Sequence, residues 1–107
     1  MKPSKKILIA EDEKTLAHAM ELKLSNAGYT VTVANDGDQA IQYLKKNKYD
    51  LLLLDLIMPV SDGFNVLQNM KTSKNKTPVI VMSNLSQEED KLKTTNFGVK
   101  DFFIKSD

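Results

Sequence analysis

The sequence predicts an α/β protein whose helices cover both faces of a doubly wound parallel sheet. Apolar residues alternate between strand-like and helix-like spacing along the 107 residues, which is typical of consecutive βαβ units. Residues 51–54 are four leucines in a row, as expected of a strand buried on both faces of such a sheet. The pattern gives five strands and four helices in strict alternation, and right-handed βαβ crossovers between them imply a parallel, doubly wound sheet.

The first two strands and the helix between them are predicted in residues 6–34. Residues 6–10 form a short apolar strand, and residues 15–27 form a helix. The apolar face of this helix consists of Leu16, Met20 and Leu24. Gly28 follows as the helix cap, because glycine adopts the positive φ that this position needs. Residues 30–34 alternate threonine and valine, as expected of a half-buried edge strand.

The middle of the chain carries two further helix starts around the leucine-rich strand. Asp36 begins the second predicted helix, and Gln39 completes a capping box three residues later. The buried stripe of this helix is predicted to be Ala40, Ile41 and Leu44. Residues 51–55 form the third strand, and the third helix begins at Asp62 and Gly63. Its inward-facing residues are predicted to be Phe64, Leu67 and Met70.

The last third of the chain is predicted to complete the sheet. Residues 79–82 form a buried strand, and a shorter polar helix runs from Ser86, capped with Glu89, to about Asn96. Residues 101–104 form the final short strand. The alternation would add a fifth helix next, but the sequence stops first. We therefore expect an open apolar face near the first and last strands, which self-association could cover.

The composition is that of one water-soluble domain. With 41% hydrophobic residues, the chain has enough apolar material for a single core, so we expect one domain over residues 1–107. The net charge of +1 does not favour a nucleic-acid binder, and residues 71–76 are expected to be a solvated helix end and loop. There is no cysteine for a disulfide or a thiolate metal site. No apolar segment resembles a signal or a membrane span, so a cytoplasmic protein is the default expectation.

Polar residues lie where four of the predicted strands end. Glu11 and Asp12 follow the first strand, Asp55 closes the third, Ser83 follows the fourth, and Lys105 follows the fifth. The carboxyl ends of parallel strands meet at one edge of the sheet, so these side chains should converge. Three carboxylates repel one another and need a cation, and oxygen ligands without nearby Cys or His favour Mg²⁺. A carboxylate, Mg²⁺, a lysine and a hydroxyl around one point predict a site that handles phosphoryl groups.

Four segments of the chain match the order and spacing of a known family's motifs. They are Glu11-Asp12, Asp55 within Leu-Asp-Leu-Ile-Met-Pro-Val-Ser-Asp-Gly, Ser83, and Gly-Val-Lys-Asp-Phe-Phe-Ile-Lys ending at Lys105. Through them, residues 5–105 resemble the receiver (response-regulator) domain of two-component signalling, in its single-domain chemotaxis or sporulation-like form. The resemblance implies a flavodoxin-like fold with strand order 2-1-3-4-5, here without the last helix.

The resemblance implies a phosphoacceptor and a magnesium site. Asp55 would be the nucleophile that takes a phosphoryl group from a phosphohistidine. Asp12 and Asp55 would bind Mg²⁺ together with the backbone carbonyl of Ile57, and Glu11 would act mainly through water. The domain would then catalyse at most its own phosphotransfer and autodephosphorylation, and would not turn over a separate substrate.

The resemblance also implies how phosphorylation is read. Ser83 would donate a hydrogen bond to the phosphoryl group, Lys105 would pair with it, and Phe102 would be the aromatic residue that switches position. Two positions depart from the family's pattern. Asn84 stands where the family prefers a small residue, and Ser106 stands where it usually has proline.

The implied partners are proteins. The phosphodonor would be a sensor histidine kinase or a histidine phosphotransfer protein, and the output would pass to an effector protein, with no direct contact to nucleic acid or membrane. An alternative is a degenerate or truncated receiver that binds or dimerises without phosphorylation. Asp12 has an alternative structural role as the cap of the first helix. A magnesium-dependent phosphatase of another family is a third possibility, but it would need an aspartate at the position of Ile57.

Overall fold

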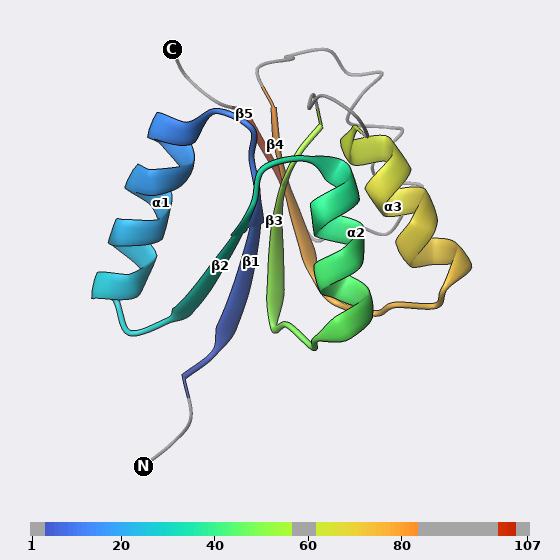
Figure 1. Ribbon diagram of the computed structural model, residues 1–107, viewed down its shortest axis with the longest axis horizontal. Helices are drawn as coiled ribbons and strands as arrows, with labels where there is room; N and C mark the ends of the chain where they lie inside the picture. Colours follow the sequence, from blue (N-terminus) through green and yellow to red (C-terminus); the bar gives the residue numbers. More distant parts are fainter. Residues whose placement is uncertain (1–3, 57–61, 84–100, 105–107) are drawn as a thin grey trace.

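The computed structural model describes residues 4–56, 62–83 and 101–104, and for Ser83 and residues 101–104 only the backbone. Five strands form one parallel sheet in the order β2-β1-β3-β4-β5. In chain order they are β1 (Lys6–Ala10), β2 (Thr30–Ala34), β3 (Leu51–Asp55), β4 (Val79–Ser83) and β5 (Asp101–Ile104). All strand pairs are parallel, so the carboxyl ends of the strands share one edge of the sheet, at the upper end of the molecule in Figure 1.

The described helices lie on both faces of the sheet. They are α1 (Lys14–Asn26), α2 (Gly37–Lys46) and α3 (Gly63–Thr72). Figure 1 shows α1 on one face and α2 with α3 on the other, which confirms the predicted doubly wound architecture. The fourth predicted helix lies in residues 86–96, outside the described residues, so the prediction of four helices is untested.

Two helices begin where the sequence predicted a capping aspartate. The Asp36 carboxylate accepts a hydrogen bond from the Gln39 backbone N–H at 2.8 Å, and Asp62 accepts one from the Asn65 N–H at 2.9 Å. Each bond satisfies one of the amides that a helix start leaves without an intrahelical acceptor. The local sequence signal was therefore sufficient to place the starts of α2 and α3.

The ends of α1 and α3 use the same turn with different residues. The residue after each helix cap has a positive φ, of 101° at Gly28 and 59° at Lys74. At α1 the Tyr29 N–H donates to the Leu24 carbonyl at 3.1 Å, and at α3 the Asn75 N–H donates to the Met70 carbonyl at 2.8 Å. This is the Schellman pattern of helix termination, which favours glycine at the positive-φ position. The predicted role of Gly28 is confirmed, and Lys74 fills the equivalent position at a conformational cost.

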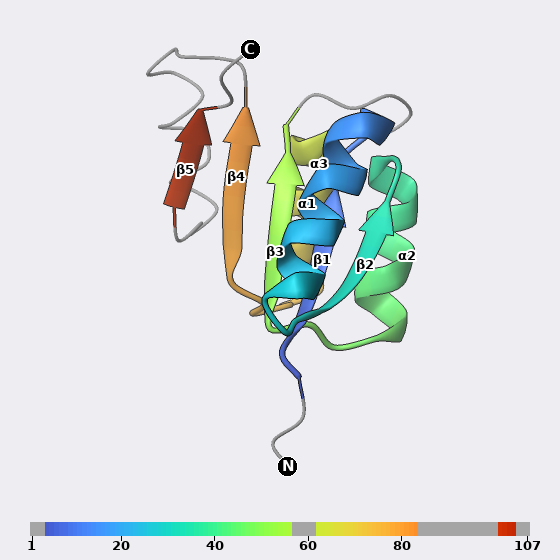
Figure 2. The same cartoon turned by 90° about the vertical axis from the view of Figure 1, so that its left-hand side faces the viewer.

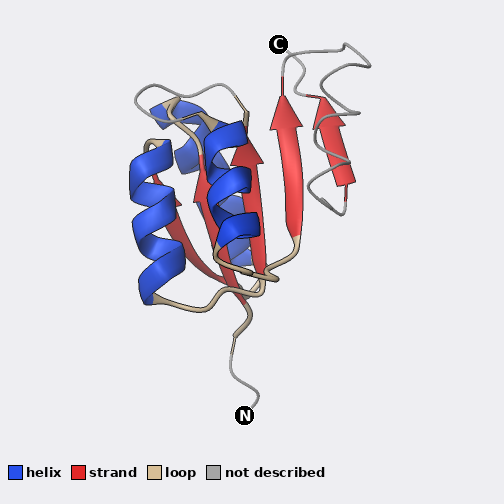
Figure 3. Cartoon of the chain, turned by 90° about the vertical axis from the view of Figure 1, so that its right-hand side faces the viewer, coloured by secondary structure: helices blue, strands red, loops and turns tan. Residues whose placement is uncertain are grey.

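The core is tighter on the α2–α3 face of the sheet than on the α1 face. Strand residues on the α2–α3 face are almost completely buried, namely Leu8, Ala10, Leu52, Leu54, Val79 and Val81. They pack with buried helix residues, among them Ala40, Leu44, Val66, Leu67 and Met70. On the other face α1 packs against β1 and β2, where Ile7 and Ile9 are buried, but Leu51, Leu53 and Ile80 of β3 and β4 are only half-buried. Figure 2 and Figure 3 show the described helices over β2, β1 and β3 rather than over β4 and β5.

The predicted apolar face of α1 is only partly buried. Leu16, Met20 and Leu24 are all half-buried, whereas the smaller Ala17 is 2% exposed. The helix therefore buries its alanine more completely than its larger apolar side chains. Spacing along the chain identified the inward side of α1 but could not show how closely that side would be covered.

Candidate functional site

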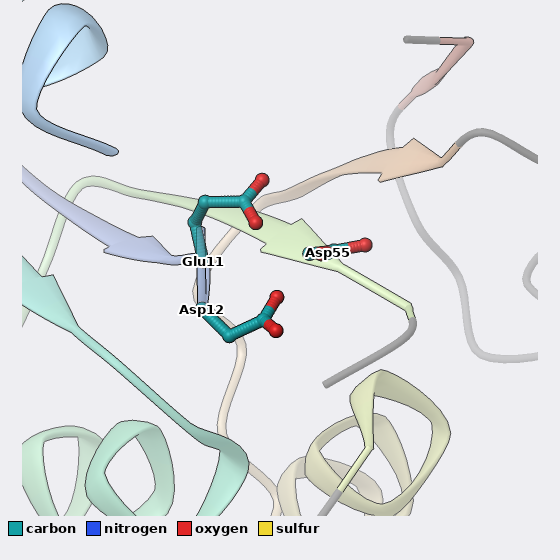
Figure 4. A group of neighbouring side chains, drawn as sticks. All are labelled: Glu11, Asp12 and Asp55. Carbon is teal, nitrogen blue, oxygen red and sulfur yellow. The ribbon is translucent and has the colours of Figure 1, made fainter. Parts of the chain in front are cut away.

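Two neighbouring strands bring acidic residues to the carboxyl edge of the sheet. Glu11 directly follows β1, and its N–H donates to the Ala34 carbonyl at 3.0 Å, which continues the pairing with β2. Asp55 is the last residue of β3 and lies beside Met82 of β4. Because β1 and β3 are paired in parallel, their last residues reach the same edge. Figure 4 shows the carboxylates of Glu11, Asp12 and Asp55 grouped there.

The three carboxylates are close together but differ in burial. One carboxylate oxygen from each residue lies within 4.8 Å of the other two. Glu11 is fully buried and Asp55 is 4% exposed, whereas Asp12 is exposed to solvent. The Oε2 atom of Glu11 accepts a hydrogen bond from the Glu13 N–H at 3.1 Å, which holds this side chain in place. Two buried carboxylates and an exposed third form a group of acidic side chains that water reaches at Asp12.

The alternative structural role of Asp12 as a helix cap is not seen. The residue in the cap position of α1 is Glu13, and no side chain caps the start of this helix. The Asp12 carboxylate is instead part of the acidic group with Glu11 and Asp55. The sequence could not decide between these roles, because an aspartate before a helix has the same local pattern in both.

The residues of this group suit a hard divalent cation. Their ligand atoms are all carboxylate oxygens, which Mg²⁺ and Ca²⁺ prefer over softer donors. The exposed side at Asp12 leaves room for the water molecules that Mg²⁺ usually retains. The predicted convergence of Glu11, Asp12 and Asp55 is therefore present, and the group fits the cation that the sequence predicted.

The start of α3 packs against the backbone of Asp55 and Leu56. The Gly63 N–H donates to the Leu56 carbonyl at 2.9 Å. A Cβ atom at Gly63 would lie 2.5 Å from the Asp55 carbonyl oxygen and 2.6 Å from the Leu56 Cα. Only glycine fits this contact without displacing the strand end. The sequence predicted that a helix begins at Asp62 and Gly63, but only the structure shows that Gly63 packs against the end of the strand that carries Asp55.

The other predicted site residues are described in part or not at all. Ser83 ends β4, one residue beyond the partner of Asp55, so its backbone lies at the same edge of the sheet. The backbone of Phe102 lies in β5 opposite Val81. Ile57 and Lys105 lie outside the described residues, as do Asn84 and Ser106. The structure thus brings together the three acids and the backbone end of β4.

The sequence has relatives over nearly its whole length. The model of the response regulator receiver domain family matches residues 7–106. The transcriptional regulatory protein DltR of Streptococcus agalactiae is 36% identical over 94% of this chain and 45% of the relative. The cell cycle response regulator CtrA of Brucella ovis is 34% identical over 94% of this chain and 43% of the relative. The chain spans less than half the length of these curated relatives.

Solved structures agree with the family match. The receiver domain of the Francisella response regulator 1452 superposes with a TM-score of 0.91 at 33% identity, covering 95% of this chain and 84% of that one. The response regulator TrrA of Thermotoga maritima, solved with Mg²⁺ and BeF, gives a TM-score of 0.84 at 25% identity, covering 95% and 87%. Within the described part of the chain, no helix is long and apolar enough to span a bilayer. With its flavodoxin-like sheet and these matches, the chain belongs to the response regulator receiver domain family.

Proposed function

We propose that Asp55 is the phosphoacceptor of this receiver domain and that it works with Mg²⁺ bound by Asp12 and Asp55, with Glu11 acting mainly through water. The observation that carries the proposal is the group of three carboxylates at the sheet edge, in which Asp55 is almost completely buried. A buried strand end holds a reacting carboxylate in one orientation, which lowers the entropy cost of reaction. The related TrrA was solved with Mg²⁺ and BeF, which supports the same cation here.

The proposed reaction is phosphoryl transfer from a phosphohistidine. A carboxylate oxygen of Asp55 attacks the phosphorus atom, the P–N bond of the donor breaks, and an aspartyl phosphate forms as the imidazole leaves. Bound Mg²⁺ supplies positive charge beside the phosphoryl oxygens, which the acidic group would otherwise repel. Asp12, Asp55 and the backbone carbonyl of Ile57 are the proposed ligands, with Glu11 acting mainly through water. Gly63 keeps the Asp55 backbone in place during the transfer.

Labelling with a small phosphodonor tests this proposal. Wild-type protein should take up label from phosphoramidate or acetyl phosphate only with Mg²⁺, and Asp55→Asn should lose the label. Asp62→Asn is the matched control, because asparagine caps a helix as well as aspartate does and the charge change is the same. Equal labelling of wild type and Asp55→Asn would refute Asp55 as the acceptor.

We propose that Ser83, Lys105 and Phe102 convert the phosphorylated state into an output. Support comes from the backbone, since Ser83 closes the strand beside Asp55 and Phe102 lies in the next strand. The Ser83 hydroxyl would donate to a phosphoryl oxygen and the Lys105 ammonium group would pair with another. Ser83→Ala should keep the capacity for labelling but reduce any change in partner binding that labelling causes. A full binding response in Ser83→Ala would contradict the switch.

The proposed partners are a sensor histidine kinase or histidine phosphotransfer protein and a downstream effector protein, in the cytoplasm. The alternative is a degenerate receiver that binds its partner without phosphorylation. The two differ in one measurement, which is partner affinity before and after labelling. A change in affinity that Asp55→Asn abolishes supports the signalling role, whereas labelling-independent binding supports the alternative.

We further propose that the chain, as one domain over residues 1–107, self-associates through the α1 face of the sheet. The half-buried Leu51, Leu53 and Ile80 on this face support the proposal, because apolar surface of this kind favours association. Sedimentation velocity over a range of concentrations should show a dimer that Leu51→Gln weakens. A folded monomer at all concentrations would contradict it.

A further inference from the structure

A second feature lies at the opposite edge of the sheet from the carboxylates. A cleft of about 890 Å³ opens between the C-terminal ends of α2 and α3, near the starts of β3 and β4. Figure 1 places both helix ends at the lower end of the molecule, away from the carboxyl ends of the strands. The length of β3 separates the two regions, roughly 15 Å for a strand of this length.

The charges around the cleft are mostly of one sign. Lys45, Lys46, Lys48 and Lys76 line it and are exposed, and Asp50 is the one acidic residue among the described residues of its lining. The Asp50 carboxylate already accepts a hydrogen bond from the Lys6 backbone N–H at 2.7 Å. Among the described residues, no carboxylate lies within 4.0 Å of the four lysine ammonium groups. In a chain whose net charge is +1, this is a local excess of cations.

Helix dipoles explain only half of this lysine cluster. Lys45 and Lys46 lie in the last turn of α2, where cations stabilise the helix end. Lys48 lies beyond the end of α2, and Lys76 lies beyond the end of α3. The sequence predicted a solvated helix end and loop for residues 71–76, but it could not show that Lys76 lines the same cleft as the lysines at the end of α2. The fold brings the two segments together.

The lining also offers contacts to an extended peptide. Leu44 and Met70 are buried beneath it, and Tyr49 is half-buried. Asn47 and Asn75 provide side-chain amides that can both donate and accept hydrogen bonds, as a peptide backbone requires. An open cleft with an apolar base and a cationic rim has the polarity that an acidic segment would complement.

We infer that this lysine-lined cleft binds an Asp- and Glu-rich segment of a partner protein. The four ammonium groups attract and orient the segment, and the asparagine amides bind its backbone. The cleft lies away from Asp55, so a phosphodonor and this partner can occupy the domain together. The inference does not rest on the chemistry of Asp55.

Binding of a fluorescently labelled decaglutamate peptide tests the inference by anisotropy. The cleft variant carries Lys→Gln at 45, 46, 48 and 76, and the matched control carries Lys→Gln at 5, 6, 14 and 23, which are exposed lysines elsewhere. At about 50 mM NaCl, where screening is weak, the cleft variant should bind about tenfold more weakly than wild type. The control and Asp55→Asn should stay within about twofold of wild type. Circular dichroism confirms that every variant is folded.

Three results would overturn the inference. The first is that wild-type protein does not bind the peptide at all. The second is that the cleft variant and the control weaken binding equally, which would leave only nonspecific attraction between charges. The third is tighter binding of a single-stranded oligonucleotide of equal charge with the same dependence on the four lysines, because the cleft would then bind phosphates. The inference is supported if wild-type protein binds the peptide more tightly than the oligonucleotide and only the cleft variant loses this binding.

Discussion

The two edges of the sheet carry opposite charge and hold it in different ways. At the carboxyl edge, Glu11 and Asp55 are buried and lie with Asp12 within 4.8 Å of one another. At the opposite edge, four lysines project into solvent around an open cleft. The acids are held together by the backbone in spite of their repulsion, whereas the lysines can move apart. Only the acidic edge should therefore carry a substantial cost in stability.

The largest effect is expected from a substitution that disrupts the contact between α3 and the acidic edge of the sheet. In Gly63→Ala, the new Cβ would lie 2.5 Å from the Asp55 carbonyl oxygen, so the strand end or α3 must move. We expect the free energy of unfolding to fall by about 3 kcal/mol and the affinity for Mg²⁺ to fall as well. Urea denaturation and a magnesium titration measure the two effects.

Gly28→Ala is the control for this substitution. An added Cβ at Gly28 meets nothing within 4 Å, so its cost comes only from the φ of 101°. That cost should be about 1 kcal/mol, with no change in Mg²⁺ affinity. Equal losses of stability in the two variants would show that the contact between Gly63 and Asp55 is not restrictive.

The second prediction tests the repulsion within the acidic group. Asp12→Asn removes one of three neighbouring negative charges, so without divalent cations the unfolding midpoint should rise by about 3 °C. Mg²⁺ should stabilise wild-type protein but should stabilise Asp12→Asn much less. Thermal unfolding in EDTA and in excess Mg²⁺ measures both changes.

Asp38→Asn gives the opposite sign and serves as the control. Asp38 lies in the first turn of α2, where a negative charge is favourable, so its removal should lower the midpoint slightly. A lower midpoint in metal-free Asp12→Asn would contradict repulsion at the acidic edge.

A third, smaller effect is expected at the basic edge. Lys74 follows α3 with a φ of 59°, a conformation that glycine adopts without strain. Lys74→Gly should therefore stabilise the protein by about 1 kcal/mol in urea denaturation. Lys45→Gly, within α2, should instead destabilise it by about 1 kcal/mol. A loss of stability in Lys74→Gly would mean that the lysine side chain has a structural contact of its own.

The smallest expected change in stability concerns the lysine cluster itself. Replacing lysines 45, 46, 48 and 76 by glutamine should change the free energy of unfolding by less than about 1 kcal/mol. The reason is that these lysines are exposed and form no ion pair with the described carboxylates. A large destabilisation would make the cluster structural, and it would also remove the contrast between the two edges.

Much of the fold could be predicted because its signals are local. Strands at 6–10, 30–34 and 51–55 have the predicted bounds, since runs and alternations of apolar residues mark them directly. The first helix begins at Lys14 instead of residue 15, because Glu13 occupies its cap position. The three acids of the candidate site could be predicted as well, because the topology of a parallel sheet brings strand ends together.

By itself, the sequence determined the order of the elements, the capping aspartates and the convergence of the acids on one edge. These depend on neighbouring residues and on the handedness of crossovers, which are properties of any chain with this pattern. Only the tertiary structure decided that Glu11 is buried and Asp12 exposed, that Gly63 contacts Asp55, and which lysines share a cleft. Burial and contact depend on distances between segments far apart in the chain, and spacing along the sequence does not specify those distances.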